Sequence, residues 1–414
     1  MTQETTVRQV RRGGGGIESD GIERAAVRDG ELEVTLRGGQ VLRFPAMWLR
    51  DSCPCTECAD PVGGQKLHDV TDIAPDCAVA AAESIAHSAR SSGLDCAIDT
   101  LAGEGGAGEG GAAEGGAGVG AVTVTFWPDG HRSVFAADWL AAQAAGEQPD
   151  RRQLWHTAAE LGELPEVSWH RYTADPAQRA RALESVLSSG LVLLRDVPPD
   201  GGMVTQVAES FGFVRETNYG RLFDVRIEPA PGNLAFTSRE ILPHTDNPYR
   251  DPVPTLQLLH CLRAADEGGD TGLVDGFAAA AALRQQDPAA YDVLTGTTVR
   301  FEYKDLQAEL RTSQPLIQLS PDGTVRGVRF NNRSARPPYR NAARFYPAYR
   351  RWAELLARPE RRLAMRLAPG DCLIFDNTRI LHARAAFSGT GSRHLQGCYA
   401  DIDGLASTLE MIRR

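Results

Sequence analysis

Residues 242–249 read Leu-Pro-His-Thr-Asp-Asn-Pro-Tyr and place an imidazole and a carboxylate two positions apart, at His244 and Asp246. In an extended strand, residues i and i+2 point to the same face, so both side chains can enter one cavity. A non-haem Fe(II) site binds its metal with two histidines and one carboxylate, and leaves three positions open. The spacing therefore predicts two of the three protein ligands of such a site.

The third ligand is expected from a second strand. Residues 369–377 read Pro-Gly-Asp-Cys-Leu-Ile-Phe-Asp-Asn, in which a Pro-Gly turn starts an apolar run that Asp-Asn closes, and His382 follows. Arg393 comes eleven residues later, and its rigid guanidinium suits bidentate capture of a carboxylate. A His-x-Asp pair alone is common by chance, but the combination indicates an Fe(II) site that also holds 2-oxoglutarate.

A second group of metal-binding residues lies near the N-terminus. Cys53, Cys55 and Cys58 are close enough in sequence to share one tetrahedral ion if a fourth ligand arrives, and His68 is a nearby candidate. Free thiols or a disulfide are the alternatives. Because the N-terminal segment lacks the apolar core of a signal peptide, we expect a bacterial cytoplasmic protein without disulfides. The remaining cysteines are expected to be small buried residues: Cys77, Cys96, Cys261, Cys372 and Cys398.

Composition is typical of a two-part enzyme. The chain has 414 residues, of which 42% are hydrophobic, enough to fill two cores. No apolar run approaches the roughly 20 residues that cross a bilayer, so no membrane role is expected. The net charge of −10 argues against binding to nucleic acid, which is itself a polyanion.

Changes in composition suggest the domain boundaries. Residues 1–20 are polar and Gly-rich and are expected to be a disordered tail. Residues 21–145 contain short β-like runs and predict a small β-rich unit, interrupted at 103–120 by a flexible insertion of Gly, Ala and Glu. Residues 146–165 are expected to link this unit to a catalytic domain at 166–414.

The second domain is expected to be mainly β with flanking helices. Apolar residues recur at helical spacing in 176–189, and residues 190–195 read as a buried strand. Short strands then follow to the C-terminus, broken by helical pieces at 278–283 and 347–356. This order fits an antiparallel double-stranded β-helix, or jelly roll.

Several motifs resemble those of the γ-butyrobetaine and trimethyllysine hydroxylases, a branch of the taurine-dioxygenase-like (TauD/TfdA) 2-oxoglutarate oxygenases. The resemblance extends from about Ala46 to the C-terminus, interrupted at 103–120. The motifs are residues 242–249, 257–261 (Gln-Leu-Leu-His-Cys), 268–271 (Gly-Gly-Asp-Thr), 274–277 (Val-Asp-Gly-Phe), 330–332 (Phe-Asn-Asn) and 393–397 (Arg-His-Leu-Gln-Gly).

The resemblance implies a role for each matching position. His244, Asp246 and His382 would bind Fe(II), Arg393 would pair with the distal carboxylate of 2-oxoglutarate, and Thr271 would donate a hydrogen bond to the same cosubstrate. The expected reaction uses O2, converts 2-oxoglutarate to succinate and CO2, and hydroxylates a C–H bond of a small charged metabolite. A halogenase is not expected, because the carboxylate ligand that halide would replace is present.

The resemblance also implies a structural zinc site. His131 would join Cys53, Cys55 and Cys58, and a Cys3His site with no open position is structural. The resemblance further implies a homodimer formed through the small N-terminal domain. Whether ascorbate is required stays open.

The substrate pocket is expected to include an aromatic cage, which in the betaine-hydroxylating relatives binds a trimethylammonium group by cation–π attraction. Asparagine at one cage position departs from this pattern, so a quaternary ammonium acid is the leading substrate and a small phosphonate or carboxylate is the alternative. The matching positions are Tyr219, Phe223, Phe236, Asn247 and Tyr399.

The anionic end of a betaine would meet Asn233 and one of Asn331 or Asn332, with Arg333 and Arg215 nearby in sequence. Two other classes of protein were weighed against the oxygenase. A hydrolase or isomerase with another divalent metal on the same three ligands would leave Arg393 without a role. A non-catalytic zinc protein would leave His244, Asp246 and His382 without a role.

Overall fold

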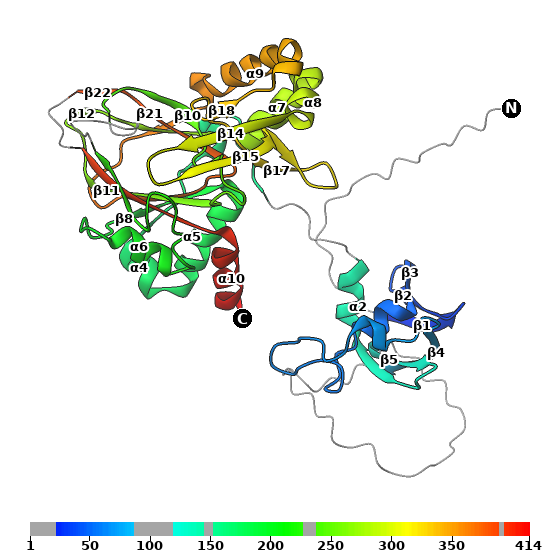
Figure 1. The fold of residues 1–414 in the computed structure, drawn as a ribbon. Coiled ribbons are helices and arrows are strands. Elements are labelled where there is room, and N and C mark those ends of the chain that lie inside the picture. The colour runs from blue at the N-terminus through cyan, green and yellow to red at the C-terminus, as the bar shows by residue number, and fades with distance from the viewer. Residues whose placement is uncertain (1–21, 87–118, 145–151, 227–236, 389–392) are drawn as a thin grey trace, which may run out of the picture. The chain divides into compact units, whose positions relative to one another are not determined.

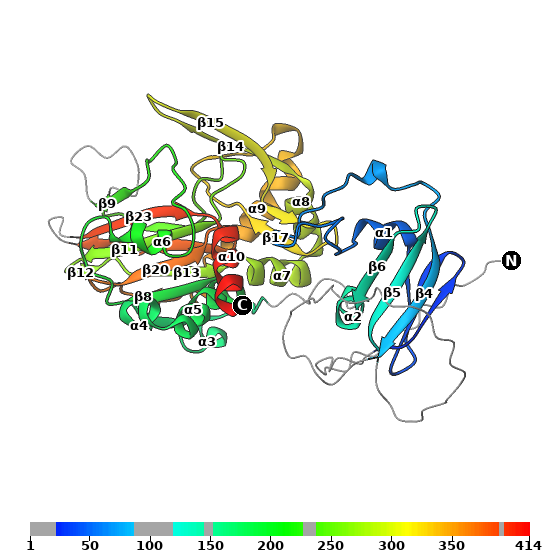
Figure 2. The same ribbon diagram turned by 90° about the horizontal axis from the view of Figure 1, so that it is seen from below.

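The computed structural model describes residues 22–86, 119–144, 152–226, 237–388 and 393–414. The chain divides into two compact units, residues 1–149 and 150–414, which are described one at a time (Figures 1 and 2). Among the helices of the described ranges, none is long and apolar enough to cross a membrane.

The first unit is a six-stranded antiparallel sheet with two helices. The strands run in the order β3-β2-β1-β5-β4, and β6 also pairs with β5. In β2, Leu32 and Val34 are fully buried and alternate with partly exposed polar residues, so one face of the sheet covers the core. The elements are β1 (Ile22–Arg28), β2 (Glu31–Leu36), β3 (Val41–Phe44), α1 (Ala46–Asp51), β4 (Ala78–Ala86), β5 (Val119–Trp127), β6 (Arg132–Ala136) and α2 (Ala137–Ala144).

The expected insertion at 103–120 falls between β4 and β5, which pair along their length. All of it except residues 119 and 120 lies outside the described residues. The two strands on either side belong to one continuous sheet.

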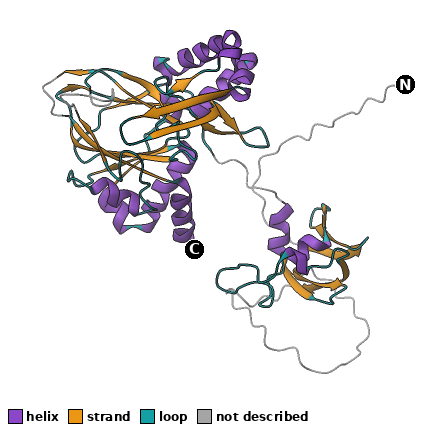
Figure 3. Ribbon diagram, in the orientation of Figure 1, coloured by secondary structure: helices purple, strands orange, loops and turns teal. Residues whose placement is uncertain are grey.

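The second unit contains two facing sheets of short strands, coloured orange in Figure 3. One has the order β10-β21-β13-β19 and the other β7-β8-β20-β11-β23-β9; all pairings are antiparallel except β7 with β8. The strands of these sheets are β7 (Glu166–Ser168), β8 (Leu191–Arg195), β9 (Phe223–Arg226), β10 (Ile241–His244), β11 (Leu256–Arg263), β13 (Thr271–Asp275), β19 (Leu363–Met365), β20 (Cys372–Asp376), β21 (Ile380–Arg384) and β23 (His394–Ala400).

Apolar side chains of both sheets meet in one core. Leu259 and Leu395 from the larger sheet pack with Leu273 and Ile380 from the smaller sheet. On the opposite face of the larger sheet, helices α5, α6 and α10 cover a second core that includes Leu258. Strand β11 is therefore buried on both faces from Leu256 to Cys261. This is the expected jelly-roll arrangement with flanking helices.

The helix predicted at 176–189 is confirmed as α5 (Pro176–Ser189). The Asp175 side chain accepts a hydrogen bond from the backbone N–H of Ala177 at its start, and Gly190, at φ +87°, ends it before β8. The other helices of this unit are α3 (Ala158–Leu161), α4 (Trp169–Ala174), α6 (Met203–Glu209), α7 (Gly276–Gln286), α8 (Pro288–Gly296), α9 (Ala342–Leu356) and α10 (Ile402–Arg413).

Helix α9 begins five residues before the expected piece at 347–356 and contains Pro347 in its interior. Its apolar face starts in the first turn, where Phe345 is buried with Tyr349 and Trp352 further along. This packing outweighs the missing backbone donor of the proline. Beside α7 to α9 lie the shorter strands β14 (Thr298–Lys304), β15 (Glu309–Pro315), β16 (Ile317–Leu319), β17 (Val325–Val328) and β18 (Ala335–Arg336), whereas β12 (Glu267–Gly268) pairs with β22 (Phe387–Ser388).

Part of the expected linker is built into the second unit. Trp155 is buried in the core between the sheets, and its Nε1 donates to the carbonyl oxygen of Ser189 at 3.0 Å. The folded part of this unit thus begins before residue 166, because Trp155 already belongs to its core. Burial of so large an apolar side chain stabilises the fold. Residues 145–151 lie outside the described ranges.

A fully buried ion pair joins these segments. Arg379 donates to both carboxylate oxygens of Asp275, at 3.3 and 2.8 Å, and also to the carbonyl oxygens of Ser188 and Gln153. Asp275 in turn accepts hydrogen bonds from two backbone N–H groups at the start of α7. The two charged side chains are 1% and 0% exposed.

Substitution Arg379→Ala should lower the free energy of unfolding of the second unit by about 3–5 kcal/mol, because it leaves the Asp275 carboxylate buried without its counter-charge. Urea denaturation followed by tryptophan fluorescence measures the change. The control is Arg413→Ala, which breaks a half-exposed pair with Glu184 and should cost less than about 1 kcal/mol. Equal losses in the two variants would contradict the expectation.

Candidate active site

Two histidines face each other across an antiparallel strand pair. The register of β10 with β21 places His244 opposite His382, and the ring centroids lie 4.2 Å apart. Nε2 of His244 is 3.4 Å from Oδ1 of Asp246, and Nε2 of His382 is 3.8 Å from Oδ2. All three ligand atoms lie within 4.8 Å of one another, so the side chains can reach one ion.

Asp246 reaches this position from a bend, because β10 ends at His244. The expectation that both ligands sit on one face of a strand is therefore wrong, although their side chains converge. Asn377, fully buried in the turn between β20 and β21, accepts from the backbone N–H of Asp246 at 2.8 Å. It also donates Nδ2 to the Asp246 carbonyl oxygen at 3.1 Å. This two-point contact joins the bend to the turn that precedes His382.

The two oxygens of the Asp246 carboxylate have different surroundings. Oδ2 accepts hydrogen bonds from Nε2 of Gln257 and from the Tyr399 hydroxyl, both at 2.9 Å, whereas Oδ1 faces His244. Burial raises the pKa of Asp246, but the nearby His382 and His244 and the Tyr399 hydrogen bond outweigh this effect and hold the pKa below its usual range. The ionised carboxylate therefore keeps one oxygen available to a cation.

Both imidazoles are suited to bind a metal through Nε2. Nδ1 of His244 lies 2.9 Å from the Leu242 carbonyl oxygen, which fixes the proton on Nδ1 and leaves the lone pair on Nε2. Burial, with a contribution from His244, lowers the pKa of His382 to about 3, so its ring is neutral at pH 7. Two imidazoles and one carboxylate are the donor set that suits a non-haem Fe(II) ion with open positions.

These ligands line a cavity of about 570 Å³ between the two sheets. Leu259 and Leu395 line it from the larger sheet, and Thr271 and Ala383 line it from the smaller sheet. Both sheets of the jelly roll thus contribute residues to one site.

Arg393 and Thr271 lie on the wall of this cavity, 6% and 4% exposed. No described carboxylate pairs with Arg393, and burial lowers its pKa from the ordinary arginine value. The backbone of Gly269 runs against the guanidinium, since a Cβ there would lie 3.2 Å from Nε. A buried cation and a hydroxyl on the wall of one cavity can hold the distal carboxylate of a dicarboxylic acid.

The positions expected to bind substrate separate into three groups. Tyr219, Phe223, Asn247, Asn331 and Tyr399 line the cavity. Asn332 does not line it, and its Oδ1 accepts a hydrogen bond from the Tyr349 hydroxyl instead. Asn233 and Phe236 lie outside the described residues.

Two tyrosines that sequence reasoning missed complete the aromatic wall. Tyr249 stacks on Tyr303 with centroids 5.0 Å apart, and its hydroxyl lies 3.1 Å from that of Tyr219. Phe223 and Tyr399 are 5.2 Å apart on the same wall. Tyr249 belongs to the motif at residues 242–249 and could have been predicted from it. Tyr303 lies in β14, where the sequence has no motif.

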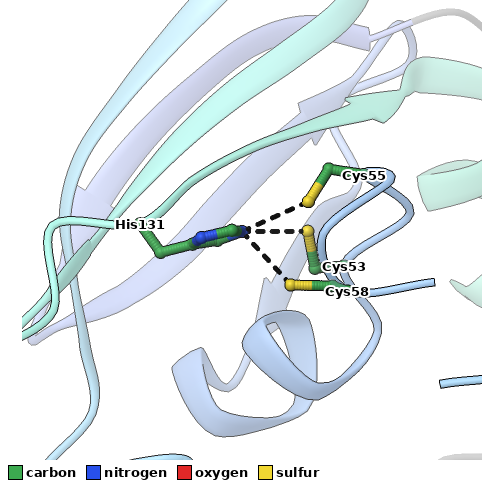
Figure 4. A group of neighbouring side chains, drawn as sticks. All are labelled: Cys53, Cys55, Cys58 and His131. Atoms are coloured by element: carbon green, nitrogen blue, oxygen red, sulfur yellow. Dashed lines mark hydrogen bonds between the residues drawn. The ribbon is translucent and has the colours of Figure 1, made fainter. Parts of the chain in front are cut away.

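The first unit holds the second candidate metal site. Nε2 of His131 lies 3.2, 3.6 and 3.5 Å from the sulfur atoms of Cys53, Cys55 and Cys58 (Figure 4). His131 follows β5 in the tight turn before β6, whereas the cysteines follow α1. Three sulfurs around one imidazole nitrogen make a closed tetrahedral set that suits Zn²⁺.

An arginine ties the two halves of this cluster together. Arg50 donates to Sγ of Cys58 at 3.3 Å and to Oδ2 of Asp129 at 2.9 Å. The other oxygen of Asp129 accepts from the backbone N–H of His131. Burial, with the nearby Arg50, lowers the pKa of His131, so its imidazole is neutral and able to bind a metal.

The competing ligand His68 lies outside the cluster, with Nε2 3.4 Å from Asp51. The described cysteines are all free thiols. Cys261, Cys372 and Cys398 are buried, as expected of small core residues, whereas Cys77 is half-buried. Cys96 lies outside the described residues.

Comparison with known proteins agrees with this geometry. Residues 151–399 match the family described as taurine catabolism dioxygenase TauD, TfdA family, and residues 24–90 match the gamma-butyrobetaine hydroxylase-like N-terminal family. The chain is 34% identical to gamma-butyrobetaine dioxygenase of Pseudomonas sp. strain AK-1, covering 92% of this chain and 94% of the relative.

Two human proteins are more distant relatives. Gamma-butyrobetaine dioxygenase of Homo sapiens is 29% identical over 95% of this chain and 97% of its own length. Mitochondrial trimethyllysine dioxygenase of Homo sapiens is 27% identical over 90% of this chain and 83% of its own length. The matched range 151–399 contains the three converging ligands and Arg393. The chain therefore belongs to the taurine catabolism dioxygenase TauD, TfdA family.

Proposed function

We propose that this protein is an Fe(II)- and 2-oxoglutarate-dependent dioxygenase that hydroxylates a C–H bond of a butyrobetaine-like quaternary ammonium acid. The observation that carries the proposal is the convergence of His244, Asp246 and His382 in one cavity with the buried Arg393. Relatives named gamma-butyrobetaine dioxygenase, similar over nearly the whole chain, support the substrate class.

In this proposal the three ligands hold Fe(II), and Arg393 with Thr271 holds the distal carboxylate of 2-oxoglutarate. When bound, the metal and cosubstrate supply the oxidative chemistry that consumes O2 and yields succinate, CO2 and the hydroxylated product. Gln257 and Tyr399 orient the ligand carboxylate through Oδ2. The apolar walls exclude water, and the substrate-facing residues aim one carbon toward the metal.

The aromatic wall supports a quaternary ammonium group as one end of the substrate. Tyr219, Phe223 and Tyr399 line the cavity with Tyr249 and Tyr303, and faces of such rings attract a cation. Asparagine at position 247 favours the second candidate, a small phosphonate or carboxylate substrate processed by the same chemistry. Comparing the two classes as stimulants of succinate release tests this choice.

The Cys3His cluster is proposed to bind structural zinc. The four side chains leave no open position once one ion is bound, and Arg50 supplies a positive charge beside Sγ of Cys58. Zinc there would join the segment after α1 to the β5–β6 turn and so contribute to the stability of the first unit.

Asp246→Ala should abolish substrate-stimulated succinate formation, because the metal loses its anionic ligand, while zinc content stays unchanged. Succinate is measured with Fe(II), 2-oxoglutarate and γ-butyrobetaine, and zinc by atomic emission. The control is Asp403→Ala on the exposed part of α10, which should retain activity. Product formation without 2-oxoglutarate, or loss of zinc in Asp246→Ala, would contradict the proposal.

Asn377→Ala should weaken Fe(II) binding about 10–100-fold, because it removes both hydrogen bonds that hold the backbone of Asp246. Anaerobic titration of the visible absorption of the ferrous 2-oxoglutarate complex measures the affinity. Asn332→Ala provides the matched control, since Asn332 lies outside the cavity lining. Unchanged affinity in Asn377→Ala would show that the ligand holds its position without this contact.

Cys55→Ser should lower zinc content and the free energy of unfolding of the first unit, because metal binding contributes directly to folding. Zinc analysis and urea denaturation measure the two effects. Cys77→Ser removes a half-buried thiol outside the cluster and should retain zinc. A Cys55→Ser protein that keeps full zinc content and unfolds like wild type would refute the zinc proposal.

A further inference from the structure

We propose that Arg333 binds the anionic end of the substrate as an oxyanion, and that this residue selects zwitterions over simple cations. This inference rests on the proposed function and deepens it. Neither the family match nor the names of the relatives gives a role to this residue.

Arg333 lines the same cavity as the metal ligands and Arg393. Its backbone N–H and its Nε both donate to Oδ1 of Asn331, at 3.2 and 3.3 Å. An arginine has five N–H groups on its side chain, so the four on the two terminal nitrogens remain available. The two contacts to one oxygen hold the base of the guanidinium while its bidentate end stays free.

The other charged groups of the lining mostly have partners of their own. Asp224 pairs with His394, Glu302 with Arg300 and Arg336, and Lys304 with Glu309. Within the part of the chain that the structure describes, Arg333 has no carboxylate partner. Arg393 also lines the wall without a described carboxylate partner, and 2-oxoglutarate would account for it, whereas the lining residue Arg384 donates to the carbonyl oxygens of Thr237 and Arg239. The exposed Arg333 side chain on the cavity wall is therefore free to pair with a second anionic group.

The sequence predicts that Asn331 contacts the anionic end of the substrate. In the structure its side chain is hydrogen-bonded within the protein instead. Its Oδ1 accepts from Arg333, and its Nδ2 donates to the Thr245 carbonyl oxygen at 3.3 Å. The segments on either side are also joined, because the backbone N–H of Thr245 donates to the Phe330 carbonyl oxygen at 2.8 Å. Asn331 thus acts as a positioning residue that fixes Arg333 relative to the segment carrying His244 and Asp246.

Arg215, the other cation considered from sequence, is not available. Its Nη1 donates to both carboxylate oxygens of Asp401, at 2.9 and 3.2 Å, and its terminal nitrogens also donate to the carbonyl oxygens of Val253 and Pro252. It is absent from the cavity lining. The structure therefore shows that Arg333 lines the cavity and Arg215 does not, which the sequence could not decide.

A second feature of the same cavity indicates a polar ligand. Asn247 is 3% exposed and lines the cavity, yet neither its Oδ1 nor its Nδ2 has a hydrogen-bond partner. A buried polar group left unpaired destabilises the folded protein. A substrate with polar atoms on the side of Asp246 would remove this cost, whereas an entirely apolar one would not.

The test compares substrates with and without the negative charge. Wild type, Arg333→Gln, Arg333→Lys and the control Arg340→Gln are assayed for succinate release with γ-butyrobetaine, its methyl ester and the corresponding trimethylammonio-phosphonate. Arg340 is exposed, in the short turn Tyr339–Asn341, and lies outside the cavity lining. The KM for 2-oxoglutarate is measured in each variant.

We expect Arg333→Gln to raise the KM for γ-butyrobetaine about 10–100-fold, the range of a lost charge-assisted hydrogen bond. The KM for the ester and for 2-oxoglutarate should stay within about two-fold of wild type, and Arg333→Lys should restore part of the loss. Arg340→Gln should behave like wild type. A wild-type preference for the phosphonate, lost in Arg333→Gln, would support the oxyanion role and identify the group as a phosphonate.

Three results would overturn the inference. Equal KM increases for the acid and the ester would make Arg333 a purely structural residue. An increase confined to 2-oxoglutarate would place Arg333 at the cosubstrate. No effect of Arg333→Gln in an active enzyme would refute this inference alone, whereas wild-type protein that releases no succinate with any of the three compounds would refute the proposed function with it.

Discussion

The catalytic unit depends on the antiparallel pairing of β10 with β21. This register sets His244 opposite His382, and the sheet behind them fixes the distance between the two rings. The third ligand depends on a different contact, the double hydrogen bond from Asn377 to the backbone of Asp246. The strand pairing and the Asn377 contact both hold the backbone in place, so the three side chains are positioned before any ion is bound.

Several buried polar atoms of the cavity lining have no protein partner in the part of the chain that the structure describes. Both amide atoms of Asn247, Nδ1 of His382 and Oε1 of Gln257 are buried and unpaired, and Arg393 and Arg333 have no described carboxylate. Elsewhere, buried charges such as Arg379 and Asp275 are fully paired. Unpaired buried atoms also occur outside the cavity, as in His260 and Trp352, so it is the position of the cavity atoms beside the candidate metal ligands that suits them to bind a ligand.

The two units arrange their candidate metal-binding side chains in opposite ways. In the first, four side chains surround one point from two segments, and Arg50 and Asp129 hold those segments together. In the second, only three side chains converge, and the remaining directions face a cavity. A closed set of ligands stabilises structure, whereas an incomplete set leaves positions for reacting molecules.

The sequence by itself predicted the three side chains that converge in the cavity, Arg393 on its wall, the cysteine cluster and the jelly-roll class. These depend on local spacing and strand periodicity, or on motifs shared with relatives. Only the tertiary structure decided that Asp246 leaves the strand and is held by Asn377, that Asn332 bonds to Tyr349 outside the cavity lining, and that Tyr303 joins the aromatic wall. Such contacts join residues far apart in the chain, and their geometry follows from strand register and packing, which no local pattern specifies.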